Sequence, residues 1–141
     1  MTASERVAME IERLFGRLTR EGGRLTNGDE PQLTLRQVFT LAAVVDGGPL
    51  RLGTLAERIG TTDATASRTV DSLLALGFVQ RRPDEEDRRA VKIAATAAGR
   101  RLVVRRRKLL ASLLERPLSG LSEVETEHVG GVLADLNALL G

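Results

Sequence analysis

The stretch from Gly60 to Ile93, GTTDATASRTVDSLLALGFVQRRPDEEDRRAVKI, contains the features that decide the fold. Its first third has the spacing of a helix but is rich in Thr and Ser, which are weaker helix formers than Ala, Leu or Glu. A charged, proline-containing segment follows between two short extended runs, which predicts a hairpin. A helix surface built from weak helix formers indicates a surface kept for function rather than for local stability.

A shorter helix precedes this stretch. In LRLGTLAERIG, apolar residues at positions 52, 55, 56 and 59 repeat at i, i+3, i+4 and i+7, and Gly60 ends the pattern. In the helix after it, one face is apolar and carries Ala66, Val70, Leu73 and Leu74. The opposite face carries Thr61, Ala64, Thr65, Arg68, Asp71 and Ser72. Two short helices with a tight turn and a following hairpin predict a winged helix-turn-helix, whose second helix enters the DNA major groove.

The residues on this opposite face suit contact with DNA. Short side chains keep the backbone close to the groove, hydroxyls reach phosphates or base edges, and Arg68 can hold a guanine through two hydrogen bonds. At the hairpin tip, Arg88 and Arg89 lie beside Asp87, so that one arginine can be held by the carboxylate while the other projects into the minor groove. The simpler interpretation is a solvent-exposed helix and a solvated charged turn, but helix and hairpin together favour DNA binding.

Further helices are predicted on both sides of this unit. The first has an apolar stripe at Val7, Ile11, Leu14, Phe15 and Leu18 and ends near Arg20 to Gly22, before a loop. The second follows Thr34, which forms a capping box with Gln37, and its expected buried stripe is Leu35, Val38, Phe39, Ala42 and Val45. Two more run from about Thr96 to Glu115 and from Ser122, capped by Glu125, through Leu140. The predicted fold class is mainly α with a small β-hairpin wing (α+β), one domain over residues 1–141.

Composition and motif content favour a cytoplasmic protein that is not an enzyme. The formal net charge of the 141 residues is only +2, which is weak evidence for a polyanionic partner. There is no cysteine, so disulfides and thiolate metal sites are excluded. The N-terminal residues have no signal-peptide pattern, and no run approaches the roughly 20 apolar residues of a membrane span. With a single histidine, His128, and no catalytic motif, we expect no metal, no cofactor and no membrane partner.

The chain resembles the MarR (multiple antibiotic resistance regulator) family of winged-helix transcription factors over nearly its whole length. The resemblance rests on LTLRQVFTL at 33–41, LGTLAERIG at 52–60 and TTDATASRTVDSLLALGFVQRRP at 61–83. Its most specific part is DEEDRRAVKIAATAAGRRL at 84–102, the wing and the following helix. There, Asp87, Arg89 and Ala90 match the family's Asp-x-Arg-small pattern.

The resemblance implies a homodimer that holds two winged units against a palindromic operator. Residues 34–95 would form the winged helix-turn-helix core, and residues 5–22 and 96–140 would form a helical dimerisation lobe. The residues themselves agree, because a chain of this size would struggle to cover its apolar terminal helices alone. These carry Leu109, Leu110, Leu113, Leu114, Leu136, Leu139 and Leu140. The alternative is plain packing within one chain.

The resemblance also assigns the residues that meet DNA. They are Thr61, Thr62, Thr65, Ser67 and Arg68 in the recognition helix and Arg88 and Arg89 in the wing, with Asp87 supporting the wing. Asp63 and Ala64 depart from the Arg-Pro or similar pair common in the family. Asp63 either accepts a hydrogen bond from a cytosine or is an ordinary charge at a helix N-terminus, and we favour the second interpretation.

A basic stretch, GRRLVVRRRK at 99–108, has two interpretations. Its six cations, from Arg100 to Lys108, either contact phosphates or an anionic ligand, or form a solvated face paired with acids on the first helix or the partner subunit. We favour the pairing. No acid lies within the stretch, so any acids that pair with it lie elsewhere in the fold.

The sequence therefore predicts a DNA-binding transcriptional regulator: a homodimeric repressor of a palindromic operator in double-stranded DNA. By family analogy, a small-molecule effector binds between the winged unit and the dimer helices, although the sequence itself identifies no residue of such a pocket. Two alternatives stay open. One is a winged-helix module that binds a protein, and the other is an architectural DNA-binding module without sequence preference.

Overall fold

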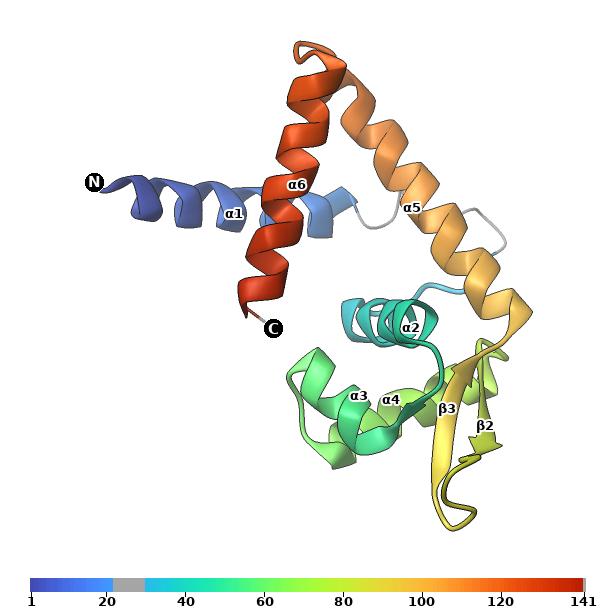
Figure 1. The fold of residues 1–141 in the computed structure, drawn as a ribbon. Coiled ribbons are helices and arrows are strands. Elements are labelled where there is room, and N and C mark those ends of the chain that lie inside the picture. The colour runs from blue at the N-terminus through green and yellow to red at the C-terminus, as the bar shows by residue number, and fades with distance from the viewer. Residues whose placement is uncertain (22–29, 141) are drawn as a thin grey trace.

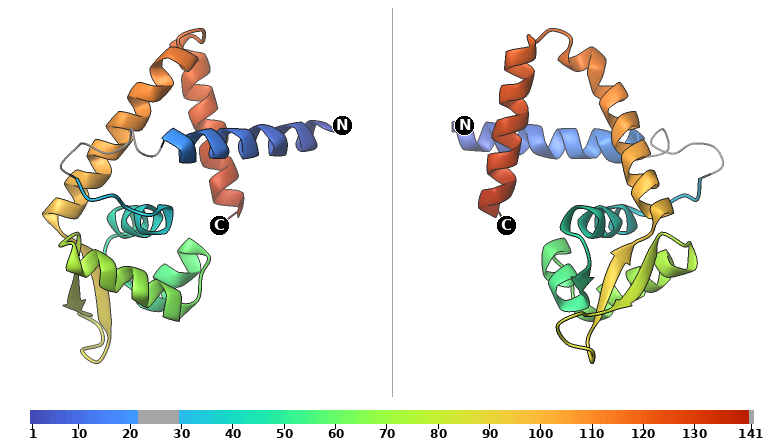
Figure 2. Two further views of the ribbon diagram at one scale, coloured as in Figure 1. Left: turned by 180° about the vertical axis from the view of Figure 1, so that it is seen from behind. Right: turned by 45° about the vertical axis from the view of Figure 1, so that its right-hand side comes forward.

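The computed structural model describes residues 1–21 and 30–140 of the chain. Its elements are α1 (Ala3–Arg20), α2 (Leu35–Gly47), β1 (Leu50–Arg51), α3 (Leu52–Ile59), α4 (Asp63–Ala75), β2 (Val79–Pro83), β3 (Val91–Ala95), α5 (Ala97–Leu118) and α6 (Glu123–Leu140). Figure 1 shows a compact body formed by α2, α3, α4 and the strands, with α1, α5 and α6 extending beyond it. α5 starts at the sheet and runs away from the body, and α6 turns back from the far end of α5 (Figure 2).

Four leucines, one from each of α2, α3, α4 and α5, form the centre of the core. Leu41, Leu55, Leu73 and Leu102 each expose 1% of their surface or less. Apolar side chains of the sheet, among them Ile93, complete the cluster. Because Leu102 lies in the second turn of α5, the start of this helix belongs to the compact body although the rest of it projects away.

The sheet has three strands, whereas the sequence indicated two. Strand β3 is central, in the order β1-β3-β2, and both pairings are antiparallel. In β1, Leu50 pairs with Ile93 and Arg51 pairs with Lys92. Two residues are too few to show a period-two pattern, so β1 has no local signal in the sequence. It depends on strand pairing and on the burial of Leu50.

Both predicted capping boxes are confirmed. Thr34 and Gln37 exchange side chain to main chain hydrogen bonds of 2.8 and 3.2 Å at the start of α2. Ser122 and Glu125 do the same, at 2.7 and 3.2 Å, before α6. Helix α1 ends at Arg20, within the range expected from the sequence. The loop predicted after it falls on residues 22–29, which lie outside the described residues.

The buried stripe predicted for α2 is largely wrong. Its buried residues are Thr40, Leu41 and Val44, and of the five residues predicted only Val45 packs, partly buried, against the core. Leu35 is 42% exposed, and Phe39, one helical turn later, is 51% exposed. α2 is apolar on two faces, and periodicity does not tell which of them meets the core. The second face is directed towards α1 and α5 instead.

Helices α1 and α6 bury no side chain within the chain. Their exposed large apolar residues are Val7, Ile11, Leu14, Phe15, Val124, Val129, Val132, Leu133, Leu139 and Leu140. Exposed apolar residues in such numbers on two helices indicate an interaction surface on a folded protein. No described helix is both long and apolar enough to cross a bilayer.

The start of α5 lies unusually close to the backbone in front of β2. A Cβ on Gly99 would lie 2.1 Å from the carbonyl oxygen of Phe78 and 3.2 Å from Cδ1 of Leu41. The same carbonyl accepts the N–H of Thr96 at 3.0 Å, so it is not free to move aside. Glycine is therefore the residue that allows α5 to start directly on the compact body.

We expect Gly99→Ala to lower the free energy of unfolding by about 1–3 kcal/mol, as overpacking of a tight core contact does. Urea unfolding followed by circular dichroism would measure it. Gly53→Ala is the matched control, because this glycine also lies in a helix and its Cβ would meet no atom within 4 Å. The control should leave stability unchanged or slightly raised. Equal stability of the two variants would show that the contact at Gly99 relaxes without cost.

Candidate nucleic-acid interface

The turn between α3 and α4 depends on Gly60. This residue has a φ of +66°, in the left-handed region that favours glycine, and it ends α3. The N–H of Thr61 then donates to the carbonyl of Ala56 at 3.0 Å. Thr62 caps α4, because its Oγ1 accepts the N–H of Thr65 at 3.2 Å. Thr62 therefore has a structural role at the helix start besides the DNA contact predicted for it.

Helix α4 has a buried inner face and an exposed polar outer face. The buried residues are Ala66, Thr69, Val70 and Leu73. On the outer face, Asp63, Ala64, Arg68 and Asp71 are exposed, and Thr65 and Ser67 at its flanks are half-buried. Asp71 is paired with Arg81 of β2 at 2.8 Å. Arg68 is thus the cation on this face that no carboxylate of the described residues neutralises.

Hydrogen bonds hold the side chains at the start of α4 in place. Thr65 Oγ1 accepts from Thr62 Oγ1 at 3.1 Å and from Arg68 Nη2 at 3.3 Å. The turn residue Thr61 accepts from Arg36 Nη1, at the start of α2, at 2.8 Å. These contacts join three of the five residues predicted for the recognition helix, Thr62, Thr65 and Arg68, into one cluster next to Thr61, and Ser67 lies outside it.

Ser72 does not lie on the outer face, where the sequence pattern placed it. It is half-buried, and its Oγ accepts from Gln37 Nε2 of α2 at 3.0 Å and donates to the carbonyl of Thr69 at 2.7 Å. Ser72 therefore lies on the side of α4 that faces α2 rather than the solvent. α2 therefore contacts the recognition unit at two points, through Arg36 at the turn and through Gln37 along α4.

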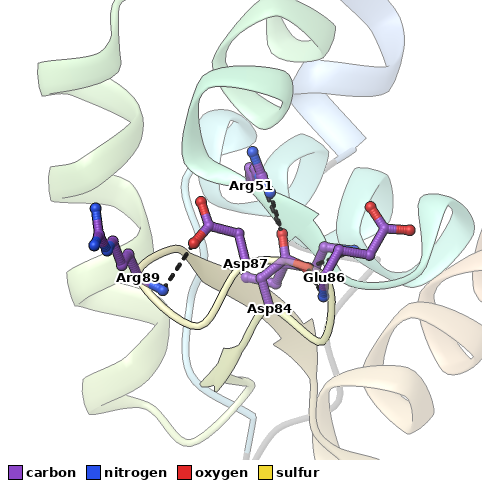
Figure 3. A network of polar contacts seen from close by, with 6 residues as sticks. Arg51, Asp84, Glu86, Asp87 and Arg89 are labelled. Carbon is purple, nitrogen blue, oxygen red and sulfur yellow. Dashed lines mark hydrogen bonds and ion pairs between the residues drawn. The ribbon is translucent and has the colours of Figure 1, made fainter.

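The wing is the loop between β2 and β3, which projects from the body at the end away from the turn between α5 and α6 (Figure 1). Residues 85–89 are all exposed, Arg88 and Arg89 among them. Figure 3 shows Asp87 beside the backbone of Arg89, whose N–H donates to Asp87 Oδ1 at 3.0 Å. The sequence suggested that Asp87 holds an arginine side chain. It holds the Arg89 main chain instead, since an aspartate readily bonds the N–H two residues on.

A second carboxylate supports the wing, and sequence reasoning missed it. Asp84 is 1% exposed, and its Oδ2 accepts from Arg51 Nε at 2.7 Å (Figure 3). Hydrogen bonding from the Glu86 N–H and then from Arg51 keeps the pKa of Asp84 below its usual range. No sequence signal could have found this pair, because Arg51 lies on a strand that has no pattern of its own.

Two of the six cations in the basic stretch of α5 are paired with acids of the same chain. Arg105 forms an ion pair with Glu30, and Arg107 Nη2 lies 2.7 Å from Asp46 Oδ2. Pairing was the favoured interpretation, but these acids lie before α2 and at its end, not on α1. Burial lowers the pKa of the neighbouring Arg106. The stretch therefore fastens α5 to α2 and its preceding segment.

An apolar cavity of about 350 Å³ lies between α1, α2 and α5. Its lining residues are Phe15, Leu18, Thr19, Leu33, Leu35, Val38, Phe39, Leu41, Ala42, Val103, Arg106, Arg107 and Leu110. The second apolar face of α2 forms one wall. The sequence had identified no pocket residue, because the walls come from three helices distant in the chain.

These features define a class of protein: a winged helix-turn-helix, with a recognition helix and a wing on one compact body. No group of three His, Asp or Glu side chains in residues 1–21 and 30–140 is placed to hold a metal ion. Residues 32–90 match the sequence model of the MarR family. Over this matched segment, which holds the recognition helix and most of the wing, the chain is similar to the MarR family of winged helix-turn-helix transcriptional regulators, whose members are DNA-binding proteins and not enzymes.

Curated relatives agree with this assignment. The chain is 34% identical over 76 residues, 54% of its length, to the uncharacterized HTH-type transcriptional regulator YhjH of Bacillus subtilis. It is 38% identical over 74 residues, 52% of its length, to the HTH-type transcriptional repressor NicR of Pseudomonas putida. The matched segments span 43% of YhjH and 47% of NicR, so less than half of each relative.

Solved structures show the same fold over the whole chain. FabT of Streptococcus pneumoniae, in complex with DNA, has a TM-score of 0.76 at 20% identity, covering 97% of this chain and 96% of FabT. S. aureus MepR bound to ethidium bromide has a TM-score of 0.65 at 21% identity, covering 100% and 98% of the two chains. The predicted fold class is confirmed, with the correction that the sheet has a third strand.

Proposed function

We propose that the chain is a homodimeric repressor that binds a palindromic operator in double-stranded DNA. The observation that carries the proposal is the presence, on one compact body, of an exposed helix face with an unneutralised Arg68 and an exposed wing with Arg88 and Arg89. α4 would enter the major groove and the wing the adjacent minor groove. FabT was solved with DNA and NicR is a repressor, which supports the same role here.

The residues at the start of α4 would divide the work of recognition. Arg68 would reach a base edge, while the hydroxyls of Thr61, Thr62, Thr65 and Ser67 would contact phosphates or base edges at the groove. Asp63, in the first turn of α4, is an ordinary charge favoured by the helix dipole in this proposal. We place such a protein where its DNA is, in the cytoplasm.

We expect Arg68→Ala and Arg89→Ala each to weaken operator binding about 10-fold or more, as loss of a good arginine contact does. Site selection from random duplex DNA would supply the operator, and fluorescence anisotropy across a salt series would measure affinity. The selected site should be a palindrome with half-sites about one helical turn, or 34–36 Å, apart.

Arg13→Ala is the control, because this exposed arginine lies on α1, away from the winged body and from the Val7, Ile11 and Leu14 stripe. It should leave operator affinity unchanged. If neither Arg68 nor Arg89 affects binding, the proposed DNA interface is wrong, and a protein-interaction module becomes the better description. Binding that depends on both arginines but selects no sequence would indicate an architectural role.

The proposed division of the chain is supported by the burial of α2, α3 and α4 in the core and by the exposure of α1 and α6. Residues 34–95 would form the DNA-binding core, and residues 5–22 and 96–140 the dimerisation lobe, of which residue 22 is not described. The exposed apolar stripe of α1 and the exposed apolar residues of α6 leave a surface that a second copy of the chain would cover. A dimer also matches the two-fold symmetry of a palindromic operator.

We expect Ile11→Asp to shift the protein from twice the 15.2 kDa chain mass to the mass of a single chain, because a carboxylate in an apolar interface is costly to bury. Sedimentation velocity at several concentrations would show the change. Arg13→Asp is the matched control: it puts the same side chain on α1 but away from the Val7, Ile11 and Leu14 stripe. Equal masses of both variants would contradict an α1 interface.

The apolar cavity is our proposed effector site. One face of α2 lines it, while Arg36 and Gln37 on the other side bond to Thr61 and Ser72 of the recognition unit. A ligand that moves α2 would therefore move α4, provided it binds the displaced state more tightly. MepR was solved with ethidium bromide, which supports a ligand-responsive regulator.

Apolar and aromatic compounds that fit about 350 Å³ should raise the melting temperature and lower operator affinity. Differential scanning fluorimetry on a compound panel, followed by anisotropy with operator DNA, would measure both effects. Ala42→Phe, which adds a ring to the cavity wall, should remove the temperature shift. A compound whose stabilisation survives this change binds elsewhere, and one that stabilises without releasing DNA is not an effector.

A further inference from the structure

We propose that Asp84 and Arg51 are positioning residues for DNA binding: their ion pair fixes the wing against the helix-turn-helix, so that Arg88 and Arg89 meet the minor groove while α4 is in the major groove. Neither residue needs to touch DNA for this role. The inference rests on the proposed DNA-binding function. It adds a part of the reading apparatus that lies outside both the recognition helix and the wing tip.

Asp84 closes the wing loop at its base. Its N–H donates to the carbonyl of Ala90 at 3.0 Å, which joins the two ends of the loop. Its Oδ1 accepts the N–H of Glu86 at 3.0 Å, which fixes the first turn of the loop. Asp87 then fixes the second turn through the Arg89 N–H. The conformation of the arginine-bearing tip is thus built on the buried side chain of Asp84.

Arg51 connects this base to the helix-turn-helix. It is the last residue of β1 and the residue immediately before α3 begins. Its Nε donates to Asp84 Oδ2 at 2.7 Å, across 33 positions of the chain (Figure 3). Asp84 follows β2, and β1 and β2 flank β3 on opposite sides. The ion pair therefore spans the sheet and joins the wing to the start of the first recognition-unit helix.

Positive charge on one face of the sheet gives the Asp84 carboxylate a structural role. Strand register places Arg51, Lys92 and Arg82 directly opposite one another on the three strands, hence on one face. Like charges at such positions repel. Asp84 is the acid that offsets this repulsion. Its Oδ2 accepts a hydrogen bond from Arg51, and its Oδ1 lies 3.9 Å from Lys92 Nζ. Its lowered pKa keeps it ionised throughout the neutral range.

The other polar link between the wing strands and the helix-turn-helix, the ion pair of Arg81 with Asp71, lies before the loop begins. Residues 85–89 are all exposed, so no side chain of the tip is buried against the body. The flanking Pro83 is also exposed. A projecting loop held by strand pairing alone can sway about its base. The single buried polar side chain at that base, Asp84, therefore controls where the tip points.

Double-mutant cycles on operator binding test the inference. Asp84→Asn keeps the shape and the acceptor for the Glu86 N–H but removes the charge, and we expect it to weaken binding about 10-fold, as loss of a wing contact does. In the Asp84→Asn background, Arg89→Ala should cost little more, because the wing is already displaced. Arg68→Ala should cost as much as it does in the unmodified protein, because α4 is not displaced.

Further variants separate positioning from direct contact. Arg51→Gln should act like Asp84→Asn and add little to it, and Arg51→Lys should recover part of the lost affinity. Arg82→Gln is the matched control, because it removes a cation from the same row without a bond to Asp84. It should change affinity less than Arg51→Gln. Affinities are compared at a temperature where circular dichroism shows each variant to be fully folded.

Three results would overturn the inference, and they point to different causes. If Arg89→Ala alone leaves affinity unchanged, the proposed wing contact is wrong and the positioning role falls with it. If Arg89→Ala weakens binding and its effect simply multiplies with that of Asp84→Asn, the wing contact stands but Asp84 does not position it. If Arg51→Gln still lowers affinity and the salt dependence of binding in the Asp84→Asn background, Arg51 contacts phosphate itself.

Discussion

The contact of four leucines, from α2, α3, α4 and α5, is the interaction on which the DNA-binding body depends. Each fully buried leucine contributes about 1.5–3 kcal/mol through removal of its side chain from water. Because these four side chains belong to one buried cluster, they hold the helices that surround it in a fixed arrangement. The inner face of α4 supplies all the side chains that this helix contributes to the core. The residues of its outer face are therefore not needed for packing and can serve recognition. An outer face rich in Thr, Ser and Ala is tolerated on α4 because packing, not local helix propensity, stabilises this helix.

Helix α2 is the element that connects the different parts of the molecule. It gives Leu41 and Val44 to the core, Arg36 and Gln37 to the recognition unit, and Asp46 to the ion pair with α5. Its remaining apolar face lines the cavity. A displacement of α2 therefore reaches the recognition helix and the long helix at the same time. This explains why its apolar residues exceed the number that the core alone requires.

Elements with a strong local signal were predictable from the sequence, and elements defined by distant contacts were not. The capped helices and the wing follow from short-range rules, and the resemblance of residues 84–102 pointed to the family whose sequence model matches residues 32–90. The buried face of α2 was mistaken because a helix apolar on two sides has no unique inner stripe. Strand β1 and the role of Asp84 were invisible, since each exists only through a partner more than 30 positions away. The DNA contacts of the predicted site residues stay predictions.

The absence of a side chain at Gly99 also determines how motion is transmitted. Because this glycine lets α5 start directly on the sheet, the 22-residue helix is attached to the body as far as Arg107, near its middle, and its far end is free of the body. A helix of that length is a lever of about 33 Å, so a tilt of about 5° at its base moves its far end by about 3 Å. In a dimer joined through the far ends of its two α5 helices, these ends are held in place, and a tilt of α5 moves the DNA-binding bodies instead. A sub-ångström adjustment beside the base would change the separation of two reading heads by several ångströms.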